Sequence, residues 1–134
     1  MRIVVDTNVL VSGIFFGGPP GRILHTWREG AVQFVLSSEI LEEYQEVLGE
    51  VACSHAGVDL RALVGLLVLH AEMVVSPPLS EIVCTDPADD KFLACALAAG
   101  VNCIVSGDKH LLKMTGYRGI EVLKPRDFLE RYLS

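Results

Sequence analysis

The sequence predicts an α/β protein, a three-layer α/β/α sandwich around a mainly parallel sheet of four to five strands. The first observation is that short β-branched runs alternate with segments of helical periodicity, the pattern of parallel strands joined by helices. The second is the length of 134 residues, which suits one domain with a sizeable core. We therefore expect residues 1–134 to form a single domain.

The expected strands are short. Arg2–Val5 is a β-branched run that is too brief for a helix and suits the centre of a parallel sheet. Four later apolar runs have the same character and are bounded by turn or capping residues. They cover residues 32–36, 73–75, 102–105 and 120–123.

Helices are expected between these strands. An apolar segment, 9–16, follows Asp6, and the glycines and prolines of 17–21 indicate a turn or mobile loop before a helix that ends near Gly30. Ser37 or Ser38 is placed to cap the next helix. The remaining helices are expected over 59–70, from Asp86-Pro87 to Gly100, and from Pro125 onward.

Composition excludes several classes of protein. Hydrophobic residues make up 51% and charged residues 21% of the chain, so it is not disordered. The most apolar stretch, 62–75, is interrupted by Gly65, His70 and Glu72 and does not have the character of a membrane span. Because Asp6 follows the first strand so closely, the N-terminus does not resemble a signal peptide, and we expect a cytoplasmic protein.

The four cysteines show no metal-binding spacing. None forms a C-x₂-C pair, and Cys95 and Cys103 lie among apolar residues, where a thiol usually acts as a small core side chain. We expect Cys53 and Cys84, like the other two, to have no zinc or disulfide role.

The formal net charge of −6 is unfavourable for binding nucleic acid, because affinity for phosphate comes mostly from Lys and Arg. Two features answer this objection. Some acids could be metal ligands whose charge a bound cation offsets. The basic residues are also concentrated in the last quarter of the chain, at Lys109, His110, Lys113, Arg118, Lys124, Arg126 and Arg131.

Acidic residues follow the expected strands. In open parallel sheets, ligands bind beyond the carboxyl ends of the strands. Carboxylates gathered there repel one another without a cation, and carboxylate oxygens are ligands for Mg²⁺, which can activate water and stabilise charge on a phosphodiester. The candidates are Asp6, Glu42, Glu43, Asp86, Asp89, Asp90 and Asp108.

Each acid also has a structural interpretation. Asp6 and Asp86 stand where helix caps are expected, and Asp89 could complete a capping box. Asp90 could simply favour the positive end of a helix dipole, and Asp108 could be a turn residue. Glu42 and Glu43 could belong to a solvated helix face. A functional site is therefore indicated only by the positions of all these acids taken together.

Four motifs resemble a known family, the PIN domain. Val4-Val5-Asp6-Thr7-Asn8-Val9-Leu10 looks like its opening strand and first acid. Residues 38–48 look like the helix of the second acid, residues 86–96 like that of the third, and Val105-Ser106-Gly107-Asp108 like the fourth. The resemblance covers nearly the whole chain in the right order, and the motifs are most similar to those of toxins that resemble the VapC nucleases.

The resemblance implies a set of site residues. Asp6, Glu43, Asp89 and Asp108 correspond to the family's catalytic, metal-binding acids, with Mg²⁺ or Mn²⁺ as cofactor. We prefer Glu43 to Glu42 from its spacing to Val47-Leu48. Asp89 is preferred to Asp90 because the latter is one position, roughly 100°, around the helix. The secondary candidates are Glu42, Asp86 and Asp90.

The function implied is that of a hydrolase, a metal-dependent endoribonuclease and the toxin of a toxin–antitoxin pair. The alternative is a non-catalytic RNA-binding or protein-interaction module on the same fold. The expected partners are RNA, a cognate antitoxin and a second copy of the chain, since PIN-domain toxins are commonly homodimers. Apolar residues near Trp27, such as Ile23 and Leu24, and the segment 62–69 are expected to supply the dimer surface. The expected substrate-binding residues are Thr7, Asn8, Arg22, Ser106, Lys109 and Lys113, with His110 and Lys91 as further basic candidates.

Overall fold

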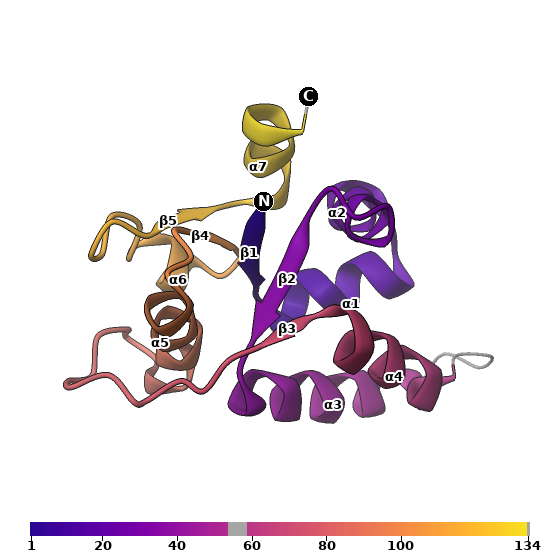
Figure 1. Cartoon of the computed structure of the whole chain (residues 1–134), viewed down its shortest axis with the longest axis horizontal. Helices are drawn as coiled ribbons and strands as arrows, with labels where there is room; N and C mark the ends of the chain where they lie inside the picture. Colours follow the sequence, from indigo (N-terminus) through magenta and orange to yellow (C-terminus); the bar gives the residue numbers. More distant parts are fainter. Residues whose placement is uncertain (54–58, 134) are drawn as a thin grey trace.

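The computed structural model describes residues 1–53 and 59–133. Its sheet has five parallel strands in the order β3-β2-β1-β4-β5, and this confirms the predicted α/β class (Figure 1). The strands are β1 Arg2–Val5, β2 Gln33–Leu36, β3 Glu72–Met73, β4 Cys103–Val105 and β5 Glu121–Leu123.

Helices cover both sides of the sheet. Figure 1 shows α5 on one side of β1 and β2, with α1 and α2 on the other. This arrangement gives the expected three layers. The helices are α1 Thr7–Phe15, α2 Gly18–Arg28, α3 Ser38–Ala52, α4 Leu60–His70, α5 Asp90–Ala99, α6 Lys109–Leu112 and α7 Pro125–Tyr132, with a 3₁₀ turn η1 at Pro87–Asp89.

The central strand β1 positions the first acid. Ile3, Val4 and Val5 are at most 1% exposed, as expected for a strand covered on both faces. Val5 pairs with Val105 of β4, and the amide of Asp6 donates to the Val105 carbonyl at 2.9 Å. The ends of β1 and β4 therefore bring Asp6 alongside the turn that contains Ser106.

Helix caps account for several boundaries. Ser37 accepts a hydrogen bond from the amide of Ile40 at 3.3 Å and begins α3, while Asp59 accepts from Ala62 at 3.2 Å and begins α4. Gly100 adopts a left-handed conformation with φ of 68° and ends α5, a position where glycine lacks the Cβ penalty.

The structure corrects two boundaries and adds one helix. Residues 17–21 do not form an extended loop, because Gly17 turns the chain with φ of 78° and α2 begins at Gly18, with prolines in its first turn. The third strand lies at Glu72–Met73 rather than 73–75, although the Val74 amide still donates to Leu36 at 3.0 Å. The short helix α6 was not anticipated.

The cysteines differ in their exposure. Cys84, Cys95 and Cys103 are buried, Cys53 is exposed, and all four are free thiols. In the part of the chain that the structure describes, no helix is both long enough and apolar enough to cross a membrane.

The surface expected for self-association is corrected in part. Ile23 is only 1% exposed and belongs to the core. Trp27 stacks on Phe34 with ring centroids 4.7 Å apart. On α4, which was also expected to contribute, Leu66, Val68 and Leu69 are 47%, 50% and 75% exposed. Other exposed apolar side chains, such as Phe16, Val75 and Ile82, lie outside α4.

Candidate metal centre

Asp6 is buried at the end of β1. It occupies the N-cap position of α1 without making a side-chain cap, so the capping interpretation does not account for its carboxylate. Its Oδ2 instead accepts a hydrogen bond from Ser106 Oγ at 2.6 Å. Burial raises the pKa of Asp6, the Ser106 hydrogen bond opposes this, and the charges of Asp108 and Glu43 raise the pKa further.

Ser106 connects two of the acids. Its side chain is completely buried, and its Oγ accepts a hydrogen bond from the Asp108 amide at 2.9 Å while donating to Asp6. Because it has no exposed surface, Ser106 does not offer the direct substrate contact that was expected of it. Asp108 Oδ1 accepts from the His110 amide at 2.8 Å and caps α6, so Asp108 also has the structural role expected of a turn residue.

Asp89 is the acid with the most perturbed environment. Burial first, and then the nearby Asp108, raise its pKa to about 7, with smaller contributions from Asp6 and Asp86. Its Oδ2 is buried and has no hydrogen-bond partner. It makes no side-chain hydrogen bond as the N-cap residue of α5.

The side chains of Asp90 and Asp86 accept hydrogen bonds from nearby backbone amides. Asp90 accepts hydrogen bonds from the amides of Val83 and Cys84 at 2.9 and 2.7 Å. Burial opposes its ionisation, but these bonds outweigh it and lower the pKa of Asp90. Asp86 accepts from the Ala88 amide at 3.0 Å and caps η1. The cap expected at Asp86 is therefore confirmed.

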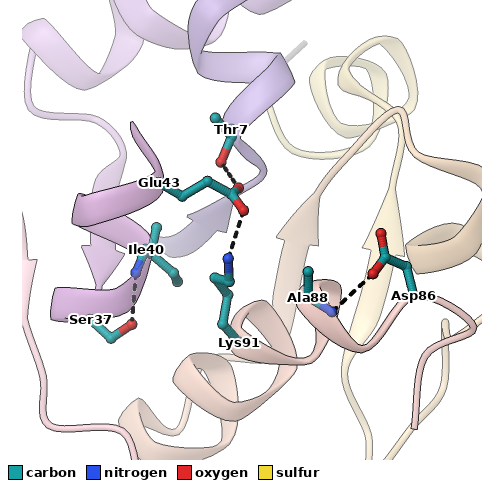
Figure 2. A network of polar contacts seen from close by, with 7 residues as sticks. All are labelled: Thr7, Ser37, Ile40, Glu43, Asp86, Ala88 and Lys91. Atoms are coloured by element: carbon teal, nitrogen blue, oxygen red, sulfur yellow. Dashed lines mark hydrogen bonds and ion pairs between the residues drawn. The ribbon is translucent and has the colours of Figure 1, made fainter. Parts of the chain in front are cut away.

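Glu43 is held by two side chains from other elements. Thr7 of α1 donates its hydroxyl to Glu43 Oε2, and Lys91 of α5 lies with Nζ 2.6 Å from Glu43 Oε1. Figure 2 shows Thr7 and Lys91 approaching the carboxylate from opposite sides. The neighbouring Glu42 is exposed. Of the pair on α3, Glu43 is therefore the one that interacts with Asp6.

The expected substrate-binding residues are divided between the site and other surfaces. Thr7 is buried against Glu43, whereas Asn8 is exposed one residue farther along α1. Lys109 and Lys113 are exposed on and just after α6, next to Asp108 in sequence. Arg22 lines a hollow with Leu129 and Leu133, and none of the four acids lines that hollow.

The acids suit a hard divalent cation. They offer carboxylate oxygens only, burial together with the charges of neighbouring acids raises the pKa of Asp6 and Asp89, and one oxygen of Asp89 is buried without a partner. Within residues 1–53 and 59–133, however, no group of three or more His, Cys, Asp or Glu side chains is placed so that it could hold a metal ion. Mg²⁺ usually takes only one or two carboxylates and completes its shell with water and phosphate, so one or two of these acids would suffice.

Sequence reasoning missed the contacts around Glu43. It assigned Thr7 to substrate and Lys91 to RNA, and it gave no role to Tyr44, whose buried hydroxyl donates to the Val5 carbonyl at the end of β1. One signal was present for Lys91. It lies in the first turn of a helix, where the dipole disfavours a cation, so a nearby acid was to be expected.

The fold and the acids together define a parallel α/β protein with a carboxylate cluster at the carboxyl edge of its sheet. A family model described as "PIN domain" matches residues 2–110. The chain therefore belongs to the PIN domain family, as the sequence motifs indicated.

Solved structures show the same fold. A chain of VapBC2 from Rickettsia felis, bound to a DNA fragment from its promoter, has a TM-score of 0.62 at 14% identity and covers 92% of this chain and 98% of its own. PAE2754 from Pyrobaculum aerophilum has a TM-score of 0.61 at 16% identity and covers 97% of this chain and 87% of its own. The comparison with curated proteins found no match.

Proposed function

We propose that the protein is a metal-dependent endoribonuclease whose site is formed by Asp6, Glu43, Asp89 and Asp108. The observation that carries the proposal is the state of Asp89. Its pKa of about 7 and its unpartnered buried oxygen describe a carboxylate that lacks a positive charge. Structural acids of this protein, such as Asp90, have their oxygens satisfied by amides instead.

Each acid has a distinct part in the proposed site. Asp6 is oriented by Ser106, and Asp89 offers its free oxygen, so these two would hold the ion, with Asp108 assisting. Glu43 would contribute charge from α3, in the position given to it by Thr7. A divalent ion bound here would supply Lewis acidity and a water of lowered pKa for hydrolysis of a phosphodiester.

The substrate proposed is RNA, approaching past the exposed residues beside the acids. Asn8 follows Thr7 on α1, and Lys109 follows Asp108 on α6. Amide and ammonium donors at these positions can bind phosphate oxygens, while the metal offsets the repulsion between phosphate and the acids.

We further propose that the chain is the toxin of a toxin–antitoxin pair. Support comes from family membership and from the likeness to a chain of VapBC2, a complex bound to its own promoter DNA. Co-expression with the product of an adjacent short reading frame tests this point. Growth arrest by this chain alone, relieved by that product and absent for Asp6→Asn, is the expected result.

Cleavage of single-stranded RNA with and without Mn²⁺ tests the enzymatic proposal. Asp6→Asn and Glu43→Gln should each lower the metal-dependent rate by at least about 100-fold, since removing even residues that support metal ligands typically costs 10–100-fold. Glu42→Gln is the matched control and should cleave like the parent, because Glu42 is exposed. Cleavage that is independent of metal, or unchanged in Asp6→Asn, would contradict the proposal. Binding without any cleavage would favour the non-catalytic alternative.

A further inference from the structure

Lys91 forms an ion pair within the acid cluster. Its Nζ lies 2.6 Å from Glu43 Oε1, and the two side chains are 24% and 26% exposed. Among the described residues, no other basic side chain forms an ion pair with any of the four proposed site acids. Lys91 is thus the positive charge that the folded chain itself supplies to this cluster.

Apart from that ion pair, the position of Lys91 near the N-terminus of α5 is electrostatically unfavourable for a cation. It follows Asp90 in the first helical turn, where unsatisfied amides and the helix dipole favour anions over cations. The pair links α5 to α3, and Thr7 holds the other oxygen of the same carboxylate. Both oxygens of Glu43 are therefore occupied by donors from the protein, whereas Asp89 keeps one oxygen free.

We propose that Lys91 is a built-in counter-cation that competes with the divalent ion for Glu43 and so weakens ion binding at this site. This inference rests on the proposed metal-dependent function. In the ion-free protein, the ammonium group offsets part of the repulsion among the acids. When an ion enters, the same ammonium group repels it and retains its hold on Glu43, so the ion binds less tightly than four uncompensated carboxylates would allow.

The alternatives predict different behaviour. If Lys91 only ties α3 to α5, its removal lowers the unfolding temperature slightly and leaves ion affinity unchanged, because partly exposed ion pairs contribute little to stability. If Lys91 instead holds Glu43 in the geometry that an ion needs, its removal weakens ion binding. Only competition predicts tighter binding.

Calorimetric titration with Mn²⁺ decides between these outcomes. Lys91→Met should bind Mn²⁺ about tenfold more tightly than the parent, as expected for losing one positive charge a few ångströms from the ion in a partly exposed site. Lys91→Arg keeps the charge and should bind like the parent. Lys124→Met is the control for net charge, because Lys124 is exposed at the start of α7, and it should change the affinity by less than about twofold.

Circular dichroism and thermal unfolding without metal establish that the variants fold. Equal or weaker Mn²⁺ binding by folded Lys91→Met overturns the inference while leaving the proposed function intact. Equal tightening by Lys124→Met also overturns it, since the effect would then come from net charge alone. If neither the parent nor Lys91→Met binds Mn²⁺, the inference and the proposed function fail together.

Discussion

Asp89 and Asp90 are adjacent in the chain but experience opposite environments. Asp90 points toward the amides of Val83 and Cys84, which stabilise its ionised form. Asp89 is only partly buried beside Asp108, and its buried Oδ2 has no partner. The carboxylate of Asp90 therefore has a structural role. That of Asp89, one residue earlier at the start of the same helix, has no such role to explain its position.

This contrast predicts the pH dependence of stability in the absence of metal. The pKa of Asp89 is raised to about 7 in the folded protein, well above that of an ordinary aspartate, so the folded state binds the proton more strongly than the unfolded state does. Its contribution to stability is therefore fully present below the unfolded pKa and is lost as pH rises through about 7. Asp89→Asn should remove this pH dependence. At pH 8, where the ionised Asp89 carboxylate destabilises the fold, the substitution should raise the unfolding temperature by about 3 °C.

Asp90→Asn is the matched control for that measurement. Hydrogen bonds lower the pKa of Asp90, so its carboxylate stabilises the fold at neutral pH, and this contribution is lost as pH falls through the folded pKa. The substitution should lower the unfolding temperature at pH 8. Thermal unfolding of the two variants from pH 5 to 8 checks both signs, and a fall in unfolding temperature for Asp89→Asn at pH 8 would contradict this assignment.

At the scale of elements, the sequence predicts what local patterns determine. The β-branched run of β1, the Ser37 cap and the Asp86-Pro87 start are local signals, and these elements lie where they were expected. The third strand was misplaced because its bounds depend on pairing with β2. The start of α2 and the helix α6 do carry local signals, the prolines in the first turn and the Asp108 cap, but these were interpreted as a loop and a turn.

The acids of the proposed site could be selected from the sequence for the same reason, because strand ends and helix starts can be recognised locally. The sequence could not show that Lys91 pairs with Glu43 across 48 positions, or that Ser106 contacts Asp6 across 100 positions. Those contacts follow from the order of strands in the sheet and from helix orientation, and neither is encoded in a local pattern.

The short helix α6 supports a prediction about RNA binding. Lys109 begins the helix and Lys113 follows it, and both are exposed next to Asp108. If both bind phosphates, changing both to Ala should weaken RNA binding and reduce the log–log salt slope by about 1.4, from about 0.7 per single-strand contact. Filter binding across a salt series checks this result, and Mn²⁺ affinity should stay nearly unchanged. Binding like the parent at physiological salt would mean that RNA enters elsewhere.

At the scale of the whole molecule, charge and apolar surface are distributed unevenly. The net charge of −6 includes the acids gathered at the carboxyl edge of the sheet, so a bound divalent ion would offset part of it. Apolar surface is exposed on α4, which also lines a hollow of about 760 Å³ together with Leu24 and Trp27 of α2. Exposed apolar surface on a helix that also borders a hollow is a candidate for a protein–protein contact.

We expect the chain to self-associate through α4. Leu69 is 75% exposed and lies beside Leu66 and Val68 on the same helix, so a second copy that covers this face would bury it. We expect the parent protein to sediment as a dimer and Leu69→Lys to sediment as a monomer, with an unchanged circular dichroism spectrum because the side chain contributes little to the core.

Ile82→Lys is the matched control, because Ile82 is 72% exposed but lies outside α4. It introduces the same charge at a similarly exposed apolar position and should leave the dimer intact. Light scattering that shows a monomeric parent at high micromolar concentration would reject the dimer. Equal dissociation by both variants would instead mean that the added positive charge, rather than the apolar face of α4, controls association.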